Sequence, residues 1–382
     1  MARLINKIRF IILAFAMLGL TVPGLNSAAA EDDTLKLAWS VDVGGKILLT
    51  PVVAGNKVLV VPAGGPLMAL DAATGEVQWK YAPTEGVWNR GLKADGTQVF
   101  VCLKGGKMAA LNVSDGTEQW KIDLGINCPR PQHVSGDAVY VSTAFVGAGL
   151  PGKPLTGAKF FSIDRATGKI NWTFTSDNFL LQTASSYGDT VYVSGGYIDP
   201  DFVGDEGGAD RFQALDRKTG QVKWTHESID GLPKTIYATQ NELVYIAYQD
   251  YAYGLDASTG KQLWKSNTSN WVPALVGKGN TVYMGAANTD VYALSTPDGE
   301  RLWIYNIPGG TFNYVLQAPF IVGDTLYFIT QKGHIYALDR NKGTPLWMHE
   351  TGEIIRIGIS VSDGVIYAGD INGRVFAYNI MK

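Results

Sequence analysis

The sequence predicts an all-β fold, an eight-bladed β-propeller of four-stranded antiparallel blades, on three observations. An eleven-residue phrase recurs seven times, its tryptophan returns every 39 to 52 residues, and a short alternating apolar strand precedes each copy. This period matches one four-stranded propeller blade rather than a helical repeat. We expect one domain, because all-β propellers commonly exceed the usual domain length.

The first thirty residues have the order of a secretory signal peptide. Three basic residues precede an apolar run from Phe10 to Leu20, and Ala30 ends a stretch of small residues. The run has eleven residues, fewer than the roughly 17–25 that cross a bilayer. We therefore expect residues 1–30 to be removed and residues 31–382 to form a soluble, exported protein, periplasmic or otherwise extracytoplasmic. The first cysteine is Cys102, so no lipid-acceptor cysteine is available near this cleavage site.

Charge and cysteine content narrow the partners. The chain has 32 basic and 35 acidic residues, and loss of the leader makes the balance more acidic, which gives no reason to expect nucleic acid. The two cysteines, Cys102 and Cys128, are too few for a disulfide scaffold. Export permits one bridge between them, and the alternative is two separate buried thiols.

The phrase assigns a mechanical role to most of its positions. The first copy reads Ala69-Leu-Asp71-Ala-Ala-Thr74-Gly75-Glu-Val-Gln-Trp79. We expect Asp71 to accept backbone N–H groups in the turn between the third and fourth strands, where Gly75 supplies a positive φ. Trp79 is large and flat enough to wedge between blades while its indole N–H finds a backbone acceptor. The other copies end at Trp120, Trp172, Trp224, Trp264, Trp303 and Trp347.

An eighth copy is split between the two ends of the repeat region. The last strand, Val375–Asn379, has no tryptophan after it, whereas Leu35–Val41 contains Trp39 with no third strand before it. Joined, the two segments make one blade. We expect this pairing to close the ring, because an open ring would leave unpaired strand edges at both ends.

These repeats resemble those of the PQQ-type propellers, and the resemblance extends over this chain from Leu35 to Lys382. The same repeat serves quinoprotein dehydrogenases and the propeller subunit of the outer-membrane β-barrel assembly machinery. The dehydrogenases are longer and usually carry adjacent cysteines, which this chain lacks. The assembly subunit matches in length, blade number and export, although it is typically a lipoprotein.

The resemblance implies a non-catalytic scaffold, monomeric outside its complex, that binds a protein partner in the cell envelope. It implies no cofactor. The alternative is a small-ligand or sensor propeller, or a quinone enzyme that binds PQQ with Ca²⁺. No residue is predicted to be catalytic.

Two neighbouring blades, the third and the fourth, each have a long loop between their second and third strands. These loops are residues 144–159 and 195–211. They are expected to raise a wall on one face, where long loops on rigid scaffolds carry function. The second loop contains Asp199, Asp201 and Asp205, a weak candidate for Ca²⁺. The alternative is a solvated acidic loop.

Residues just before the innermost strands are expected to point into the channel mouth on the same face. Cations and aromatic residues alternate there, which suits an anionic, partly aromatic ligand or an acidic peptide. The alternative is that each cation is simply solvated. The candidates are Lys46, Trp88, Arg90, Arg130, Lys234, Trp271, Phe312, Tyr314 and Arg356.

Overall fold

The computed structural model divides into two compact units, Met1–Asp32 and Asp33–Lys382. The structure describes residues 34–381 except for 126–129, 144–157, 177–178, 198–209, 229–234, 240–241, 248–250, 269–271, 273, 287–288, 310–312, 314, 316, 354 and 356. The predicted signal peptide lies outside the described residues. No helix within the described part of the chain is long and apolar enough to cross a bilayer.

The described residues of the second unit form eight four-stranded antiparallel sheets. The first four sheets, here called blades 1 to 4, follow the chain. Blade 1 contains β2 (Val52–Ala54), β3 (Lys57–Val60), β4 (Leu67–Asp71) and β5 (Val77–Tyr81). Blade 2 contains β6 (Val87–Asp95), β7 (Gln98–Leu103), β8 (Lys107–Asn112) and β9 (Glu118–Asp123). Blade 3 contains β10 (Arg130–Ser135), β11 (Ala138–Ser142), β12 (Ala158–Asp164) and β13 (Ile170–Ser176). Blade 4 contains β14 (Phe179–Tyr187), β15 (Thr190–Tyr197), β16 (Asp210–Asp216) and β17 (Val222–Ser228).

The other four sheets continue the series, and the last one takes its outer strand from the start of the domain. Blade 5 contains β18 (Thr235–Ala238), β19 (Glu242–Ala247), β20 (Tyr251–Asp256) and β21 (Gln262–Asn267). Blade 6 contains β22 (Ala274–Lys278), β23 (Thr281–Gly285), β24 (Asp290–Ser295) and β25 (Arg301–Asn306). Blade 7 contains β26 (Phe320–Val322), β27 (Thr325–Ile329), β28 (His334–Asp339) and β29 (Pro345–Glu350). Blade 8 contains β30 (Ser360–Ser362), β31 (Val365–Gly369), β32 (Arg374–Ile380) and β1 (Leu35–Asp42).

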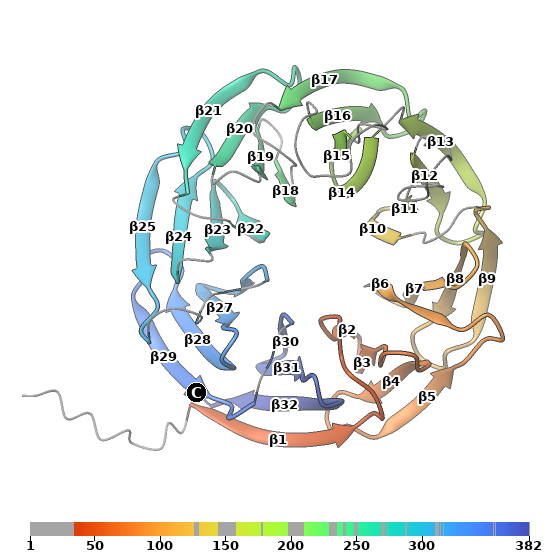
Figure 1. Ribbon diagram of the computed structural model, residues 1–382, viewed down its shortest axis with the longest axis vertical. Coiled ribbons are helices and arrows are strands. Elements are labelled where there is room, and N and C mark those ends of the chain that lie inside the picture. Colours follow the sequence, from red (N-terminus) through yellow and green to blue (C-terminus); the bar gives the residue numbers. More distant parts are fainter. Residues whose placement is uncertain are drawn as a thin grey trace, which may run out of the picture. The chain divides into compact units, whose positions relative to one another are not determined.

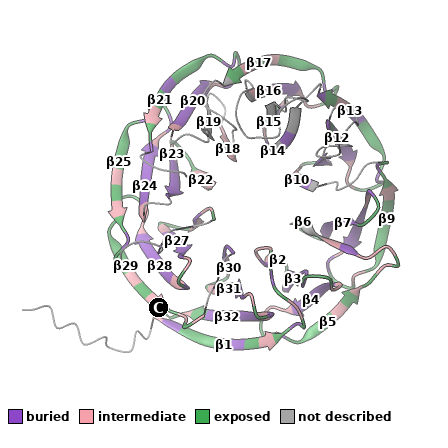
Figure 2. Cartoon of the chain, in the orientation of Figure 1, coloured by how far each residue is buried: buried purple, intermediate pink, exposed green. Residues whose placement is uncertain are grey.

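The eight sheets follow one another in a ring, with the first strand of each blade on the inside (Figure 1). The first strand of each blade contacts the first strands of both neighbouring blades, and β30 contacts β2, which completes the circle. The predicted all-β propeller of four-stranded antiparallel sheets is confirmed. The two middle strands of most blades are almost fully buried, and the outermost strands alternate between exposed and covered residues (Figure 2).

The closing strand β1 pairs antiparallel with β32, from Leu35 opposite Ile380 to Asp42 opposite Arg374. Its Trp39 is 9% exposed, and the indole N–H donates to the Ala72 carbonyl of blade 1 at 3.0 Å. One apolar cluster joins blades 7, 8 and 1. The first strand of the domain therefore holds the last blade against the first.

The repeated tryptophans dock in one direction around the ring. Seven indole N–H groups donate at 2.6–3.1 Å to a carbonyl in the following blade, and the ring lies against the glycine of that blade's phrase. The donors are Trp39, Trp79, Trp120, Trp172, Trp224, Trp264 and Trp303. A Cβ at Gly75 would lie 2.6 Å from the Trp39 ring, so this glycine is required by contact as well as by its φ of +76°. Trp347, in blade 7, packs against Tyr327 with ring centroids 5.9 Å apart.

The phrase aspartates organise the turns as predicted. Asp71 Oδ1 accepts the N–H groups of Ala73 and Thr74 at 3.0 and 3.1 Å. These bonds, led by the one from Ala73, lower the pKa of the Asp71 carboxyl. Asp164, Asp216 and Asp256 accept equivalent bonds. The first position of the phrase is small because Ala69 lies directly opposite Trp79 on the neighbouring strand β5.

Three ends of the two predicted long loops are wrong. β12 begins at Ala158, β15 continues to Tyr197, and β16 already begins at Asp210. These strands extend further because cross-strand pairing continues beyond the apolar stretch that defines them in the sequence, for example from Arg211 to Gly195.

Candidate binding site in the central channel

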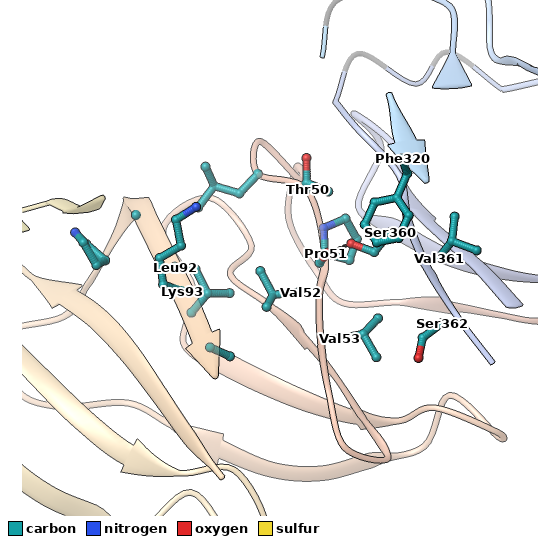
Figure 3. A pocket seen from close by; sticks show the side chains of 14 residues that line it. Thr50, Pro51, Val52, Val53, Leu92, Lys93, Phe320, Ser360, Val361 and Ser362 are labelled. Atoms are coloured by element: carbon teal, nitrogen blue, oxygen red, sulfur yellow. Dashed lines mark hydrogen bonds between the residues drawn. The ribbon is translucent and has the colours of Figure 1, made fainter. Parts of the chain in front are cut away.

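A cavity of about 550 Å³ opens between the innermost strands of several blades (Figure 3). Its wall combines residues from the starts of blades 1, 2, 3, 7 and 8. The lining residues are Leu49, Thr50, Pro51, Val52, Val53, Gly91, Leu92, Lys93, Ala94, Pro131, Phe320, Ser360, Val361 and Ser362. The cavity therefore lies on the channel side of the ring, beside the junction between blades 8 and 1.

The wall is mostly aliphatic, with a few polar groups. Lys93 is the one ionisable side chain among the described lining residues, and Thr50, Ser360 and Ser362 supply hydroxyl groups. Figure 3 places Thr50 to Val53 in a continuous run, with Lys93 on one side and Phe320 and Ser360 on the other. Pockets of this kind bind an apolar group and orient it through a few polar contacts.

An irregular stretch of β6 sets the position of Lys93. β6 pairs with β7 at Val87 and again from Leu92 onward, and the register shifts between these two points. Such a bulge bends a strand and redirects its side chains. The side chain of Lys93, two residues beyond Gly91, is exposed on the channel side.

Gly91 allows blades 2 and 3 to approach closely at the cavity wall. A Cβ on this residue would lie 2.8 Å from Cδ of Pro131 and 3.4 Å from Sγ of Cys102. The first contact is shorter than real Cβ atoms tolerate. The glycine therefore fixes the spacing of β6 and β10, which is a packing reason for its presence.

The blade 8 side of the cavity depends on ring closure. The Ser360 hydroxyl donates to the Pro51 carbonyl of blade 1, and the Tyr367 hydroxyl donates to the Ala72 carbonyl at 3.2 Å. Pro51 has no N–H group to lose in this position. The cavity wall thus includes a direct contact between blades 8 and 1.

His133 is the titratable group near this wall with the largest consequence for pH. It lies in β10, with Nε2 2.9 Å from the Ser186 hydroxyl, and stacks on Tyr140 at a centroid distance of 6.1 Å. Burial, together with the positive charges of Lys93 and Arg217, lowers the pKa of His133 to about 4. The folded ring therefore favours the neutral imidazole.

The free energy of unfolding is expected to fall as the pH decreases from 6.5 towards 4. In that pH range His133 binds a proton in the unfolded chain but stays neutral in the folded chain. The contribution of His133 to the free energy of unfolding is therefore fully present above the unfolded pKa and is lost on acidification. Replacing His133 with Gln keeps a partner for Ser186 and should flatten this decline by about 2 kcal/mol, allowing for partial exposure. Urea unfolding at pH 7 and pH 4.5 measures the difference, and parallel losses in the two proteins would contradict it.

The structure describes four of the residues predicted to lie at the channel mouth, Lys46, Trp88, Arg90 and Arg130. Lys46 precedes β2 as expected, its side chain is exposed, and its carbonyl accepts the Ala63 N–H at 2.9 Å. The expected position just before the innermost strand is wrong for Trp88, Arg90 and Arg130. The first two lie within β6, and Arg130 opens β10 opposite Ser142. These inner strands begin earlier because pairing extends to Val87 and Arg130.

The other predicted site residues lie outside the described residues, so their roles stay predictions. They are Lys234, Trp271, Phe312, Tyr314, Arg356, Asp199, Asp201, Asp205 and Cys128. Cys102 is buried in β7, and its pairing with Cys128 is therefore also untested. Within the described part of the chain, no three His, Cys, Asp or Glu residues form a group that could hold a metal ion.

Lys93 and the Thr50–Val53 run were missed by sequence reasoning. The signal used there was a cation just before an innermost strand, whereas Lys93 lies inside β6. The residues of β2 and β30 are ordinary strand residues, and each of these strands has three residues. No pattern in the sequence marks Lys93, because its direction depends on the register shift between Val87 and Leu92 in β6.

Comparison with known proteins identifies relatives. The family model described as "Outer membrane protein assembly factor BamB" matches residues 26–130, 115–239 and 230–380. An outer membrane protein assembly factor from Yersinia pestis is 29% identical over 236 residues, covering 56% of this chain and 58% of its own. The chain spans less than two thirds of the length of the first curated relatives that it matches, between 29% and 58%.

Solved structures share the fold over most of the chain. BamB from Moraxella catarrhalis superposes with a TM-score of 0.65 at 19% identity, over 90% of this chain and 99% of its own. Quinohemoprotein alcohol dehydrogenase from Comamonas testosteroni gives 0.66 at 15% identity, over 91% and 76%. At these identities the likeness shows the fold alone.

Proposed function

Because this chain belongs to the family of outer membrane protein assembly factor BamB, we propose that it is a non-catalytic scaffold. It binds a protein partner in the cell envelope during the assembly of outer-membrane proteins. The observation that carries the proposal is the family match, which extends from residue 26 to residue 380. A closed ring supports the role, because its blades hold their surfaces in fixed relative positions.

The channel cavity supports binding rather than chemistry. Its described wall offers aliphatic surface, three hydroxyl-bearing side chains and the Lys93 ammonium group. PQQ is a polycarboxylate and would favour several cations at its site. The residues that line the cavity provide one, so this wall gives the quinone alternative no specific support.

Cross-linking in the native envelope tests the scaffold proposal. The protein, tagged at its C-terminus, is expressed in its own host and cross-linked, and its adducts are identified by mass spectrometry. Membrane-embedded proteins of the outer-membrane assembly machinery are expected among the adducts. Deleting the gene is expected to lower the amounts of outer-membrane β-barrel proteins.

The cross-linking experiment needs a control chain, and some of its outcomes would contradict the scaffold proposal or favour the quinone enzyme. A chain lacking residues 35–42, whose ring should not close, controls for adducts that need no folded propeller. Unchanged outer-membrane protein levels, together with adducts no different from this control, would refute the scaffold. Dye-linked alcohol oxidation by the protein with PQQ and Ca²⁺ would instead establish the quinone enzyme.

A further inference from the structure

The outermost strands of the blades allow an internal comparison, because all eight carry a tryptophan of the repeat. In the seven outer strands whose tryptophan ends a complete copy of the phrase, the residues immediately before and after this tryptophan are exposed. In blades 1 to 4 all of these flanking residues are polar. They are Gln78 and Lys80, Gln119 and Lys121, Asn171 and Thr173, and Lys223 and Thr225.

Blades 6 and 7 break this rule at both positions. On β25, Leu302 and Ile304 are 50% and 44% exposed, and on β29, Leu346 and Met348 are 54% and 38% exposed. Leu263 of blade 5 adds a fifth residue, 49% exposed, at the position before its tryptophan. We call these five residues the apolar rim. They expose on the order of 400 Å², as large as patches that mark interaction sites on monomeric proteins.

The rim lies on neighbouring strands of one stretch of the circumference (Figures 1 and 2). Trp303 of blade 6 donates its N–H to the Arg340 carbonyl of blade 7 at 2.9 Å. Tyr305 of β25 packs on Tyr336 of β28 with ring centroids 6.1 Å apart. Blades 6 and 7 are therefore fixed relative to each other, and their exposed apolar residues lie on the outer strands of two adjoining blades.

The backbone at the rim has hydrogen-bonding capacity of its own. Among the described residues, β25 and β29 are end strands, each paired with only one neighbour, β24 and β28. An end strand presents alternate N–H and C=O groups outward, where another extended chain can pair with them. The apolar residues on each strand are two positions apart, which is the period of a β-strand and not that of a helix.

We propose that the apolar rim is a docking surface for an extended segment of a protein partner, whose alternate residues are apolar. The segment pairs with the outer edge of β25 or β29 and places its side chains against Leu302, Ile304, Leu346 and Met348. This proposal rests on the proposed function, since it takes the partner to be an envelope protein. Backbone pairing supplies affinity in this mode, and the alternate side chains supply specificity.

The test replaces the rim with residues that the chain itself uses elsewhere. The rim variant carries Leu302→Gln, Ile304→Lys, Leu346→Gln and Met348→Lys, which copies the flanking residues of blades 1 and 2. The control variant carries Gln78→Asn, Lys80→Thr, Gln119→Asn and Lys121→Thr, which copies blade 3. Thermal unfolding checks that both variants keep the ring, as expected for substitutions at exposed positions.

The probe is a fluorescent nine-residue peptide of alternating valine and threonine, followed by anisotropy. The wild-type protein and the control variant are expected to bind it, and the rim variant at least about tenfold more weakly. The same peptide N-methylated at alternate residues should also bind at least about tenfold more weakly, because it lacks the edge hydrogen bonds. Equal binding to the rim variant, or no binding to the wild type, would overturn the proposal.

Two other occupants have their own signatures. A wild-type dimer in sedimentation that the rim variant does not form would assign the rim to a second copy of this chain and overturn the proposal. Binding to phosphatidylethanolamine and phosphatidylglycerol vesicles that the rim variant loses would assign it to lipid, with the same consequence. If the rim variant gives the same envelope cross-links as the wild type, the rim proposal fails while the scaffold proposal stands.

Discussion

Removal of residues 35–42 is expected to abolish the single cooperative unfolding transition of the ring. The deletion takes away β1, the only strand paired with the outer edge of β32 in the described residues. It also removes the buried Leu35 and the Trp39 ring that docks on blade 1. Loss of one buried tryptophan alone costs about 3–5 kcal/mol, a large share of the 5–15 kcal/mol that stabilises a typical domain.

The measurement is calorimetry combined with denaturant unfolding followed by circular dichroism. A chain that begins at Thr34 is the matched control, because it keeps all of β1 and should unfold in one sharp transition. The truncated chain should show a broad transition, or aggregate through its exposed strand edge. A sharp transition at the wild-type midpoint in the truncated chain would show that the ring does not need β1.

Gly299→Ala is expected to destabilise the protein by about 2–4 kcal/mol, adding backbone strain to a steric clash. Gly299 has a φ of +72°, and a Cβ there would lie 2.4 Å from Cε3 of Trp264. Trp264 is 8% exposed and donates its N–H to the Thr296 carbonyl at 2.6 Å, so it has little freedom to withdraw. Urea unfolding measures the change in free energy.

Gly279→Ala is the control for backbone strain alone. Gly279 has a φ of +59°, but nothing lies within 4 Å of the Cβ that alanine would add. Its cost should be about 1 kcal/mol, and the excess at Gly299 measures the contact with tryptophan. In a double-mutant cycle, Trp264→Ala should relieve that excess. Equal losses for the two glycine substitutions would contradict a role for the contact.

The repeat phrase carried most of the fold because its chemistry is local. Asp71 and Gly75 form the same turn wherever they occur together, and Trp79 requires a carbonyl and a glycine on the next blade. The role of tryptophan in the repeat could therefore also be assigned to Trp39, although the third strand of its blade lies at the C-terminal end of the repeat region. β32 does pair with β1, in the antiparallel register that joins the two halves of the split copy.

The channel could not be predicted equally well, because its innermost strands carry no such phrase. β2 and β30 contain three residues each, and β6 includes a register shift that moves Lys93 relative to a regular strand. The direction of a side chain across such an irregularity depends on tertiary pairing. The apolar rim was missed for another reason: exposure of Leu302 or Leu346 appears only once the outer strands are seen at the end of each sheet.

The pairing of β1 with β32 also bears on how the molecule is made. Leu35 is synthesised at the start of the ring, and its partner Ile380 follows only after the seven blades that lie between them in the chain. Contacts between such distant residues carry a high entropic cost and form slowly. The ring therefore cannot close before β32 has been made, and until then β1 lacks the strand with which it pairs.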